Sequence, residues 1–274
     1  MRAWYTIRAT ALFCGNNVMF DNKTTFESSG VVAFYARSRE LQKPEKKILD
    51  VVGPRLAGAR FLDIGIGGGR TTEHVAPLVR EYVGVDYAAS MVAECRKRFA
   101  GKPWHDALAV ADVRAMKAYD DASFDAVWFS YNGIDYIDHD GRIAALAEIH
   151  RVAKPGAPFF FSTHNTACLP ALFAYPKTLN PVRATEALVK YVRLRTNNDP
   201  LADLVARPYA IVSDGSYAFR SATYYIRADA QARQLEDAGF AGVRVFALST
   251  GDELKDAAIA ACEDPWLYYL CARA

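Results

Sequence analysis

The chain has 274 residues, 51% of them hydrophobic, and its 33 basic and 31 acidic residues give a formal net charge of +2. This length suits one large domain, or one domain with a sizeable cap, because single cores stop growing near about 250–300 residues. The balanced charge, with no basic run longer than residues 96–98, argues against a nucleic-acid partner, and no apolar stretch is long enough to predict a membrane span.

Residues 1–30 are interpreted as an N-terminal extension, without the pattern of a signal peptide. Five widely spaced cysteines form no Cys-x-x-Cys or Cys/His cluster. We therefore expect reduced thiols, no metal site and a cytoplasmic protein of undetermined oligomeric state.

Helices and strands alternate along the rest of the chain, 31–274. Apolar periodicity predicts an N-terminal helix over 31–49. Its last part belongs to a helical stretch that starts at Pro44 and stops at Gly53-Pro54. Further helices are predicted over 71–79, 88–99, 141–153 and 227–240. Short apolar runs predict seven strands, at 59–65, 81–87, 107–113, 124–130, 157–163, 242–248 and 265–273. The alternation predicts an α/β fold: a Rossmann-like, doubly wound, seven-stranded, mostly parallel sheet with helices on both faces.

The alternation breaks after the fifth predicted strand. Residues 165–222 contain several prolines and many tyrosines, with one helical stretch near "ATEALVKYVRLR". We interpret this segment as a cap inserted between strands 5 and 6, and we expect it to cover the site and select the substrate.

The stretch "FLDIGIGGGR", residues 61–70, joins the first predicted strand to the next helix. Such a turn suits nucleotide binding, because a helix N-terminus presents free N–H groups. A dinucleotide site expects Gly-x-Gly-x-x-Gly, but Arg70 occupies the third glycine position, and the Gly-Lys-Ser/Thr ending of a Walker A loop is absent.

The stretch instead matches (D/E)-x-G-x-G-x-G, with Asp63, Gly65, Gly67 and Gly69 in place. Here the chain resembles the class I S-adenosylmethionine-dependent methyltransferases. The resemblance implies that the glycine backbone, together with Arg70, lies against the amino-acid part of S-adenosyl-L-methionine. It also implies that Asp63 fixes the loop and the ammonium end of the cofactor.

Later motifs extend the resemblance over about residues 30–165. Asp86 ends the second strand, 23 residues after Asp63, where a carboxylate can accept both ribose hydroxyls. By resemblance, further cofactor contacts come from the second strand and helix, the third strand and the loop after the fourth: Tyr87, Met91, Asp112, Val113, Ser130, Tyr131 and Asn132.

The acceptor side is predicted from position and chemistry. His164 leaves the fifth strand at the carboxyl edge of the sheet and can act as a base at neutral pH. His139 and Asp135 are weaker candidates. Tyr35 and Asn132 complete the catalytic candidates, and the predicted substrate contacts are Arg39 (one helical turn from Tyr35), Asn165, Tyr175 and Tyr225.

These features predict an S-adenosylmethionine-dependent methyltransferase that acts on a small molecule by in-line displacement at O, N or C. A second interpretation is an enzyme that cyclises the aminobutyrate part of the cofactor and releases methylthioadenosine. A third is a nucleic-acid or protein methyltransferase, and the lack of a basic patch argues against it. A fourth is a non-catalytic cofactor-binding module, and the aromatic cap argues against that one.

Overall fold

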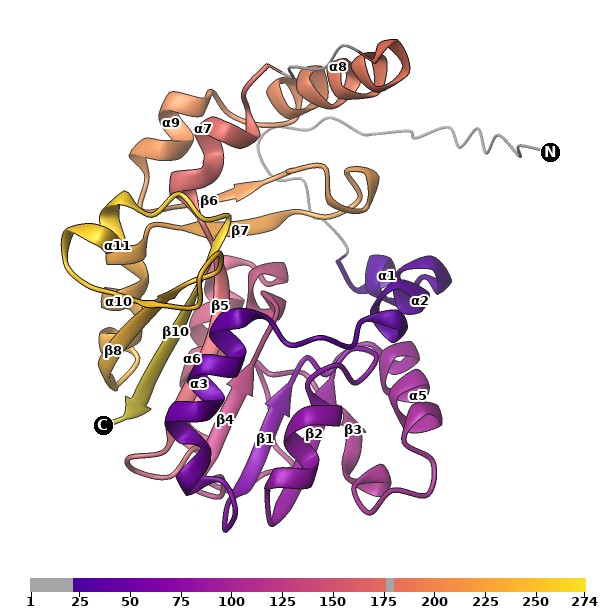
Figure 1. Cartoon of the computed structure of the whole chain (residues 1–274), viewed down its shortest axis with the longest axis vertical. Coiled ribbons are helices and arrows are strands. Elements are labelled where there is room, and N and C mark those ends of the chain that lie inside the picture. The colour runs from indigo at the N-terminus through magenta and orange to yellow at the C-terminus, as the bar shows by residue number, and fades with distance from the viewer. Residues whose placement is uncertain (1–21, 176–179) are drawn as a thin grey trace.

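The computed structural model describes residues 22–175 and 180–274, without the side chains of residues 181 and 182, and Figure 1 shows its α/β architecture. A central sheet has the strand order β3-β2-β1-β4-β5-β10-β8-β9. Its strands are β1 (Arg60–Ile64), β2 (Glu81–Asp86), β3 (Leu108–Val110), β4 (Ala126–Phe129), β5 (Pro158–Asn165), β8 (Phe240–Ala247), β9 (Glu253–Leu254) and β10 (Trp266–Arg273).

The seven predicted strands form the main part of this sheet. The first five pair in parallel, and β10 runs antiparallel between β5 and β8. The sheet also contains β9 and two strands of the cap, so the expected count of seven was too low for the whole sheet. The parallel order places the carboxyl ends of β1 to β5 along one edge, where open α/β sheets bind ligands.

Helices cover both faces of the sheet, as expected. One face packs against α3 (Lys43–Val52), α4 (Thr72–Val75) and α5 (Ala89–Arg98), through side chains such as Ile48, Val75 and Val92. The other packs against α6 (His139–Val152) and α10 (Ala228–Asp237), through Leu146, Ile149 and Leu235. Both faces are buried, which explains why the strands are continuous apolar runs.

The N-terminal part differs from the prediction. Residues 31–49 do not form one helix: α2 (Ser29–Arg37) ends before Ser38, whose backbone is extended, and α3 begins at Lys43. Residues 22–30 were expected to belong to an extension, but α1 (Asn22–Glu27) and α2 pack against the core domain, and the Glu27 carboxylate accepts hydrogen bonds from the amides of Ala89 and Ser90. The rest of that predicted extension lies outside the described residues.

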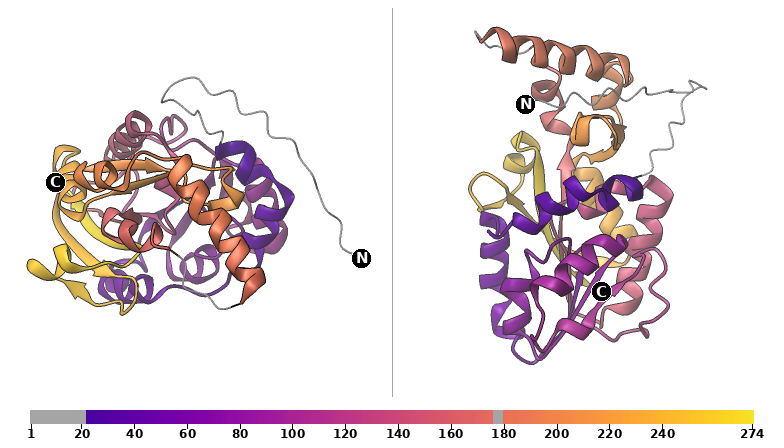
Figure 2. Two further views of the ribbon diagram at one scale, coloured as in Figure 1. Left: turned by 90° about the horizontal axis from the view of Figure 1, so that it is seen from above. Right: turned by 90° about the vertical axis from the view of Figure 1, so that its right-hand side faces the viewer.

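The cap stands on the carboxyl edge of the sheet, with α8 outermost (Figure 2). It comprises α7 (Leu169–Leu172), α8 (Pro181–Thr196), α9 (Leu201–Ala206) and the hairpin of β6 (Tyr209–Val212) and β7 (Thr223–Ile226). A small apolar core of its own includes Leu169, Phe173, Leu194 and Leu204. The hairpin continues to Ile226, four residues beyond the predicted end of the cap.

No helix in the part of the chain that the structure describes is long and apolar enough to cross a membrane. Four cysteines, Cys95, Cys168, Cys262 and Cys271, are free thiols, and the fifth, Cys14, lies outside the described residues.

Candidate active site

A cavity of about 1020 Å³ opens at the carboxyl ends of β1 to β4. Two other groups of residues close it: Asn22, Lys23, Phe26 and Tyr35 from the N-terminal helices, and Tyr209, Ile211, Ala222 and Tyr224 from the cap hairpin and its loop. The cavity therefore joins the motifs of the sheet edge to the two covering segments.

The glycines of the loop after β1 have separate packing roles. Gly65 and Gly67 line the cavity, and both have positive φ angles, 69° and 51°, which glycine adopts readily. A Cβ on Gly68 would lie 2.6 Å from the Cα of Ala36, so the backbone of α2 packs directly on this loop. Gly69 faces Phe99 and Cys95 of the core and does not line the cavity. This position differs from the predicted contact between Gly69 and the cofactor.

Two buried acids flank this loop. The carboxylate of Asp86 lines the cavity and accepts hydrogen bonds from the amides of Gly67 and Ala88, both at 2.9 Å. Asp63 lies behind the loop, where one oxygen accepts hydrogen bonds from Thr71 at 2.6 Å and Tyr82 at 2.7 Å. Burial raises the pKa of Asp63 and the pKa of Asp86 to about 6. Asp63 therefore fixes the loop, whereas Asp86 faces the cavity.

The other predicted contacts from β2, α5 and β3 also line the cavity: Tyr87, Met91, Asp112 and Val113. Asp112 is half-exposed and accepts hydrogen bonds from the Arg114 guanidinium group, at 2.9 and 3.1 Å from Nε and at 2.6 Å from Nη2. This arginine holds the pKa of Asp112 below its usual range.

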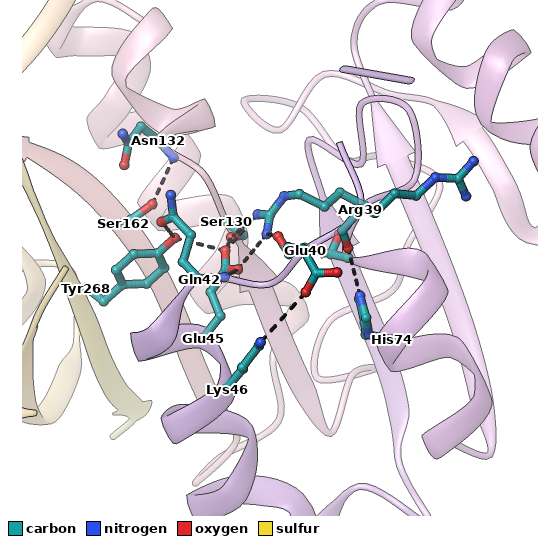
Figure 3. A network of polar contacts seen from close by, with 12 residues as sticks. Arg39, Glu40, Gln42, Glu45, Lys46, His74, Ser130, Asn132, Ser162 and Tyr268 are labelled. Carbon is teal, nitrogen blue, oxygen red and sulfur yellow. Dashed lines mark hydrogen bonds and ion pairs between the residues drawn. The ribbon is translucent and has the colours of Figure 1, made fainter. Parts of the chain in front are cut away.

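The chain turns sharply after β4. Tyr131 and Asn132 both have left-handed backbones, with φ angles of 54° and 62°, a strained conformation that clusters at functional sites. The backbone N–H of Asn132 donates to Ser162 Oγ at 2.8 Å. Figure 3 shows this hydrogen bond. Of the three residues of this loop predicted to contact the cofactor, Ser130 and Tyr131 line the cavity, whereas Asn132 is buried behind them and does not.

Arg70 is not at the cavity, contrary to the prediction. Its guanidinium group forms a bidentate ion pair with the buried Glu45, with distances of 2.5 and 2.7 Å, and lies 4.7 Å from the centre of the Tyr131 ring. Glu45 also accepts hydrogen bonds from Ser130 and from the Tyr268 hydroxyl (Figure 3). Glu45 raises the pKa of Arg70. Through Ser130 and Tyr131, this buried network holds the loop after β4 in place.

A second buried network holds His164. Asp135 accepts hydrogen bonds from Arg142 at 2.8 Å, from Thr163 at 2.5 Å, and from the backbone amide and Nδ1 of His164, both at 2.7 Å. A carboxylate only accepts, so the proton of the neutral His164 ring is on Nδ1 and Nε2 is the free acceptor. Asp135 lines the cavity, but His164, 12% exposed at its side chain, packs beside Tyr225 and Trp266 and does not.

The remaining catalytic candidate, Tyr35, lies over the glycine loop. Its hydroxyl is 2.7 Å from that of Tyr217 in the cap, and its ring is the neighbour that a Cβ on Gly67 would meet, at 3.5 Å. Burial raises the pKa of Tyr35 well above its ordinary value. This hydroxyl therefore stays protonated and can orient a ligand without serving as a base.

The structure does not bring the four predicted substrate contacts to the cavity. Arg39 follows the end of α2 and pairs with Glu73 at 3.4 Å, so it is not one helical turn from Tyr35. Asn165 donates to the carbonyl of Cys262 and caps the turn after β5. Tyr175 is 62% exposed, and the Tyr225 hydroxyl donates to Asp214.

Strand pairing explains which cap tyrosines reach the cavity. Side chains alternate along a strand, so Tyr209, Ile211 and Tyr224 of the hairpin face the cavity, while Ala210 and Tyr225 face the cap core. Tyr136 also lines the cavity, and so does His139, a weaker candidate in the sequence. The alternation can be read from the sequence, but which of the two sets of side chains faces the cavity follows only from how the hairpin is placed on the sheet.

Comparisons with known proteins point to a methyltransferase domain. Residues 61–156 match a family model described as a methyltransferase domain. A ubiquinone biosynthesis O-methyltransferase of Xanthomonas oryzae pv. oryzae is 34% identical over 129 residues, which are 46% of this chain and 52% of the relative. A demethylmenaquinone methyltransferase of Beutenbergia cavernae is 33% identical over 130 residues, 46% of this chain and 50% of the relative. The chain thus spans about half the length of these curated relatives.

Solved structures share the fold over most of the chain. The CcbJ methyltransferase of Streptomyces caelestis superposes with a TM-score of 0.63 at 16% identity, over 93% of this chain and all of that one. An S-adenosylmethionine-dependent methyltransferase of Mesorhizobium loti gives 0.56 at 19% identity, over 84% and 98%. The chain has the class I methyltransferase fold, which confirms the predicted fold class.

The chain therefore contains a stretch, residues 61–156, that matches a methyltransferase domain, and it has the fold of the class I S-adenosylmethionine-dependent methyltransferases, whose cofactor is S-adenosyl-L-methionine.

Proposed function

We propose that this protein transfers the methyl group of S-adenosylmethionine to a small-molecule acceptor. One observation carries the proposal: a single cavity joins the cofactor motifs of the sheet edge to a space closed by α1, α2 and the cap hairpin. An acceptor held between these segments can be aligned for in-line attack.

The residues present fit the cofactor. Gly65 and Gly67 leave the loop backbone open to the cavity, and Asp86 presents a buried carboxylate that retains acceptor capacity for two ribose hydroxyls. Tyr87, Met91, Asp112 and Val113 would bound the nucleoside part. When bound, S-adenosylmethionine supplies a methyl carbon already activated by a sulfonium.

The size and charge of the cavity favour a small acceptor over a nucleic acid. Its lining includes the cations Lys23 and Arg114, and Arg114 is paired with Asp112. The names of the relatives favour oxygen as the methylated atom, because the Xanthomonas protein is an O-methyltransferase. A hydroxyl acceptor must lose its proton. His164 with its Asp135 partner has the chemistry of a base but does not line the cavity, whereas His139 does.

Calorimetry and product analysis test the proposal. We expect micromolar binding of S-adenosylmethionine and S-adenosylhomocysteine, no binding of NAD, and S-adenosylhomocysteine as the product of turnover with a mixture of small hydroxylated acceptors. Binding of NAD in place of both cofactor forms would refute it. Release of methylthioadenosine would instead establish the cyclisation reaction.

A further inference from the structure

The part of the cavity away from the glycine loop is lined by the segment that begins α6 and by the cap hairpin. Figure 1 shows the hairpin crossing above the carboxyl edge of the sheet. The side chains on this part are Tyr136, His139, Tyr209, Ile211 and Tyr224. None of them belongs to the cofactor motifs.

The rings of this group hold one another in place. The His139 imidazole stacks on Tyr209 with ring centres 4.1 Å apart and planes 1° from parallel, and Tyr209 stacks on Tyr224 at 5.0 Å and 11°. The His139 Nδ1 atom is hydrogen-bonded to the Tyr224 hydroxyl at 2.8 Å. On the Tyr224 ring lies the guanidinium group of the buried Arg142, 4.6 Å from the ring centre. Both the orientation and the position of His139 are therefore fixed.

With Nδ1 occupied, His139 has Nε2 left for a ligand, and no residue in the described part of the chain forms a hydrogen bond with that atom. Ile211 is 47% exposed although it lines the cavity, so it offers apolar surface to a ligand. The charged lining residues at this end are the acids Asp138 and Asp140 and the cation Arg114, which is already paired with Asp112. Asp138 also caps α6 by accepting from the Gly141 amide at 2.7 Å. Because Arg114 is paired, the two acids leave an excess of negative charge at this rim, which disfavours a carboxylate or phosphate ligand.

We propose that Tyr136, His139, Tyr209, Ile211 and Tyr224 form the acceptor subsite, and that it binds a neutral, planar aromatic ring whose hydroxyl hydrogen-bonds to His139 Nε2. The assignment rests on the proposed function for its meaning as an acceptor site. Flat rings and Ile211 supply the apolar walls, and the imidazole can donate to or accept from a hydroxyl. Tyr224 acts as a positioning residue, because it holds His139 by Nδ1.

Fluorescence titration with 2-naphthol tests the subsite directly, in protein saturated with S-adenosylhomocysteine. We expect saturable binding of 2-naphthol, and at least tenfold weaker binding of 2-naphthoate, which has the same ring system with a carboxylate. His139→Ala and Tyr209→Ala should each weaken 2-naphthol binding about five- to tenfold or more. Affinity for S-adenosylhomocysteine should stay within twofold, which also shows that the variants are folded.

Tyr175→Ala is the matched control, because this cap tyrosine lies outside the cavity and should change neither affinity. If a truncated variant fails to bind S-adenosylhomocysteine, His139→Gln and Tyr209→Leu replace it with closer shapes. Undetectable 2-naphthol binding, preference for 2-naphthoate, or unchanged binding in the two variants would each overturn the subsite. If the wild-type protein binds 2-naphthol but does not bind S-adenosylhomocysteine, the proposed function is refuted and the aromatic subsite remains.

Discussion

The hydroxyl of Tyr35 in α2 lies 2.7 Å from the hydroxyl of Tyr217 in the cap. Two further contacts join the same segments: the Asn22 side chain donates to the carbonyl of Ala222, and Thr25 donates to that of Arg220. The N-terminal helices and the cap therefore meet above the cavity through a few polar bonds, each of which water can replace when the segments separate.

Tyr35→Phe or Tyr217→Phe should favour the separated state, because each removes the bond between the hydroxyls, worth about 0.5–1.5 kcal/mol. Amide hydrogen exchange of residues 22–37 should become faster in both variants. The double variant should exchange little faster than either single one, since the same bond is lost. Tyr175→Phe serves as control, and equal exchange in all proteins would show that the bond does not hold the segments together.

Cofactor affinity should depend on pH through Asp86. Burial raises the pKa of Asp86 to about 6, and a carboxylate accepts ribose hydroxyls better than a protonated acid does. Binding then lowers this pKa, so affinity for S-adenosylhomocysteine should be constant above about pH 7 and fall as the pH drops below 6. Asp86→Asn should weaken binding by about 1.5–3 kcal/mol and abolish the dependence.

Asp63→Asn is the control for this experiment. The pKa of Asp63 is also raised to about 6, but its side chain lies behind the loop and does not line the cavity. The pH dependence of affinity should persist in Asp63→Asn. Its disappearance there would assign the titration to Asp63 and remove Asp86 from the prediction.

Gly68→Ala should displace α2 from the glycine loop, because the new Cβ would lie 2.6 Å from the Cα of Ala36. Overpacking of this kind costs about 1–3 kcal/mol, which urea unfolding can measure, and cofactor affinity should fall as well. Gly58→Ala is a matched substitution with nothing within 4 Å of the added carbon and should change neither quantity. Similar stability of the two variants would contradict the close contact.

Glu45→Gln should destabilise the protein by about 3–5 kcal/mol, because it leaves the buried Arg70 guanidinium group without its ion-pair partner. Glu81→Gln, in an exposed pair with Arg60, should cost no more than about 1 kcal/mol. Thermal or urea unfolding distinguishes the two. Arg70→Met combined with Glu45→Gln should recover part of the loss, and a larger loss in the double variant would argue against an isolated pair.

His164→Gln tests the proposed base in turnover with a hydroxyl acceptor. If Nε2 takes the acceptor proton, kcat should fall by about 10²–10⁴, with cofactor affinity unchanged. Asp135→Asn should reduce kcat too, because His164 would lose its carboxylate partner. Normal turnover of a folded His164→Gln would leave this histidine a structural role.

The motifs on consecutive elements could be placed at the sheet edge from the sequence because each lies at the carboxyl end of a strand or in the loop that follows it, as Gly67, Asp86 and Val113 do. Contacts between distant segments were not. Arg70 and Glu45 are 25 residues apart, and nothing local marks them as partners. The end of α2 carries no glycine or proline signal, so Arg39 was placed on a helix that does not reach it. The choice between Tyr224 and Tyr225 depends on how β7 pairs with β5 and β6.

The cap leaves and rejoins the sheet at adjacent points, since Asn165 at the end of β5 pairs with Ile226 at the end of β7. The segment between these two positions is therefore an insertion whose two ends lie side by side. The residues around the glycine loop lie outside this insertion. A chimera that exchanges residues 166–225 with those of another chain of the same fold must match these two junctions and the contacts of the cap with α1, α2 and His139. Such a chimera would carry the cavity-lining hairpin residues of the donor and would keep the glycine loop and Asp86 of this chain.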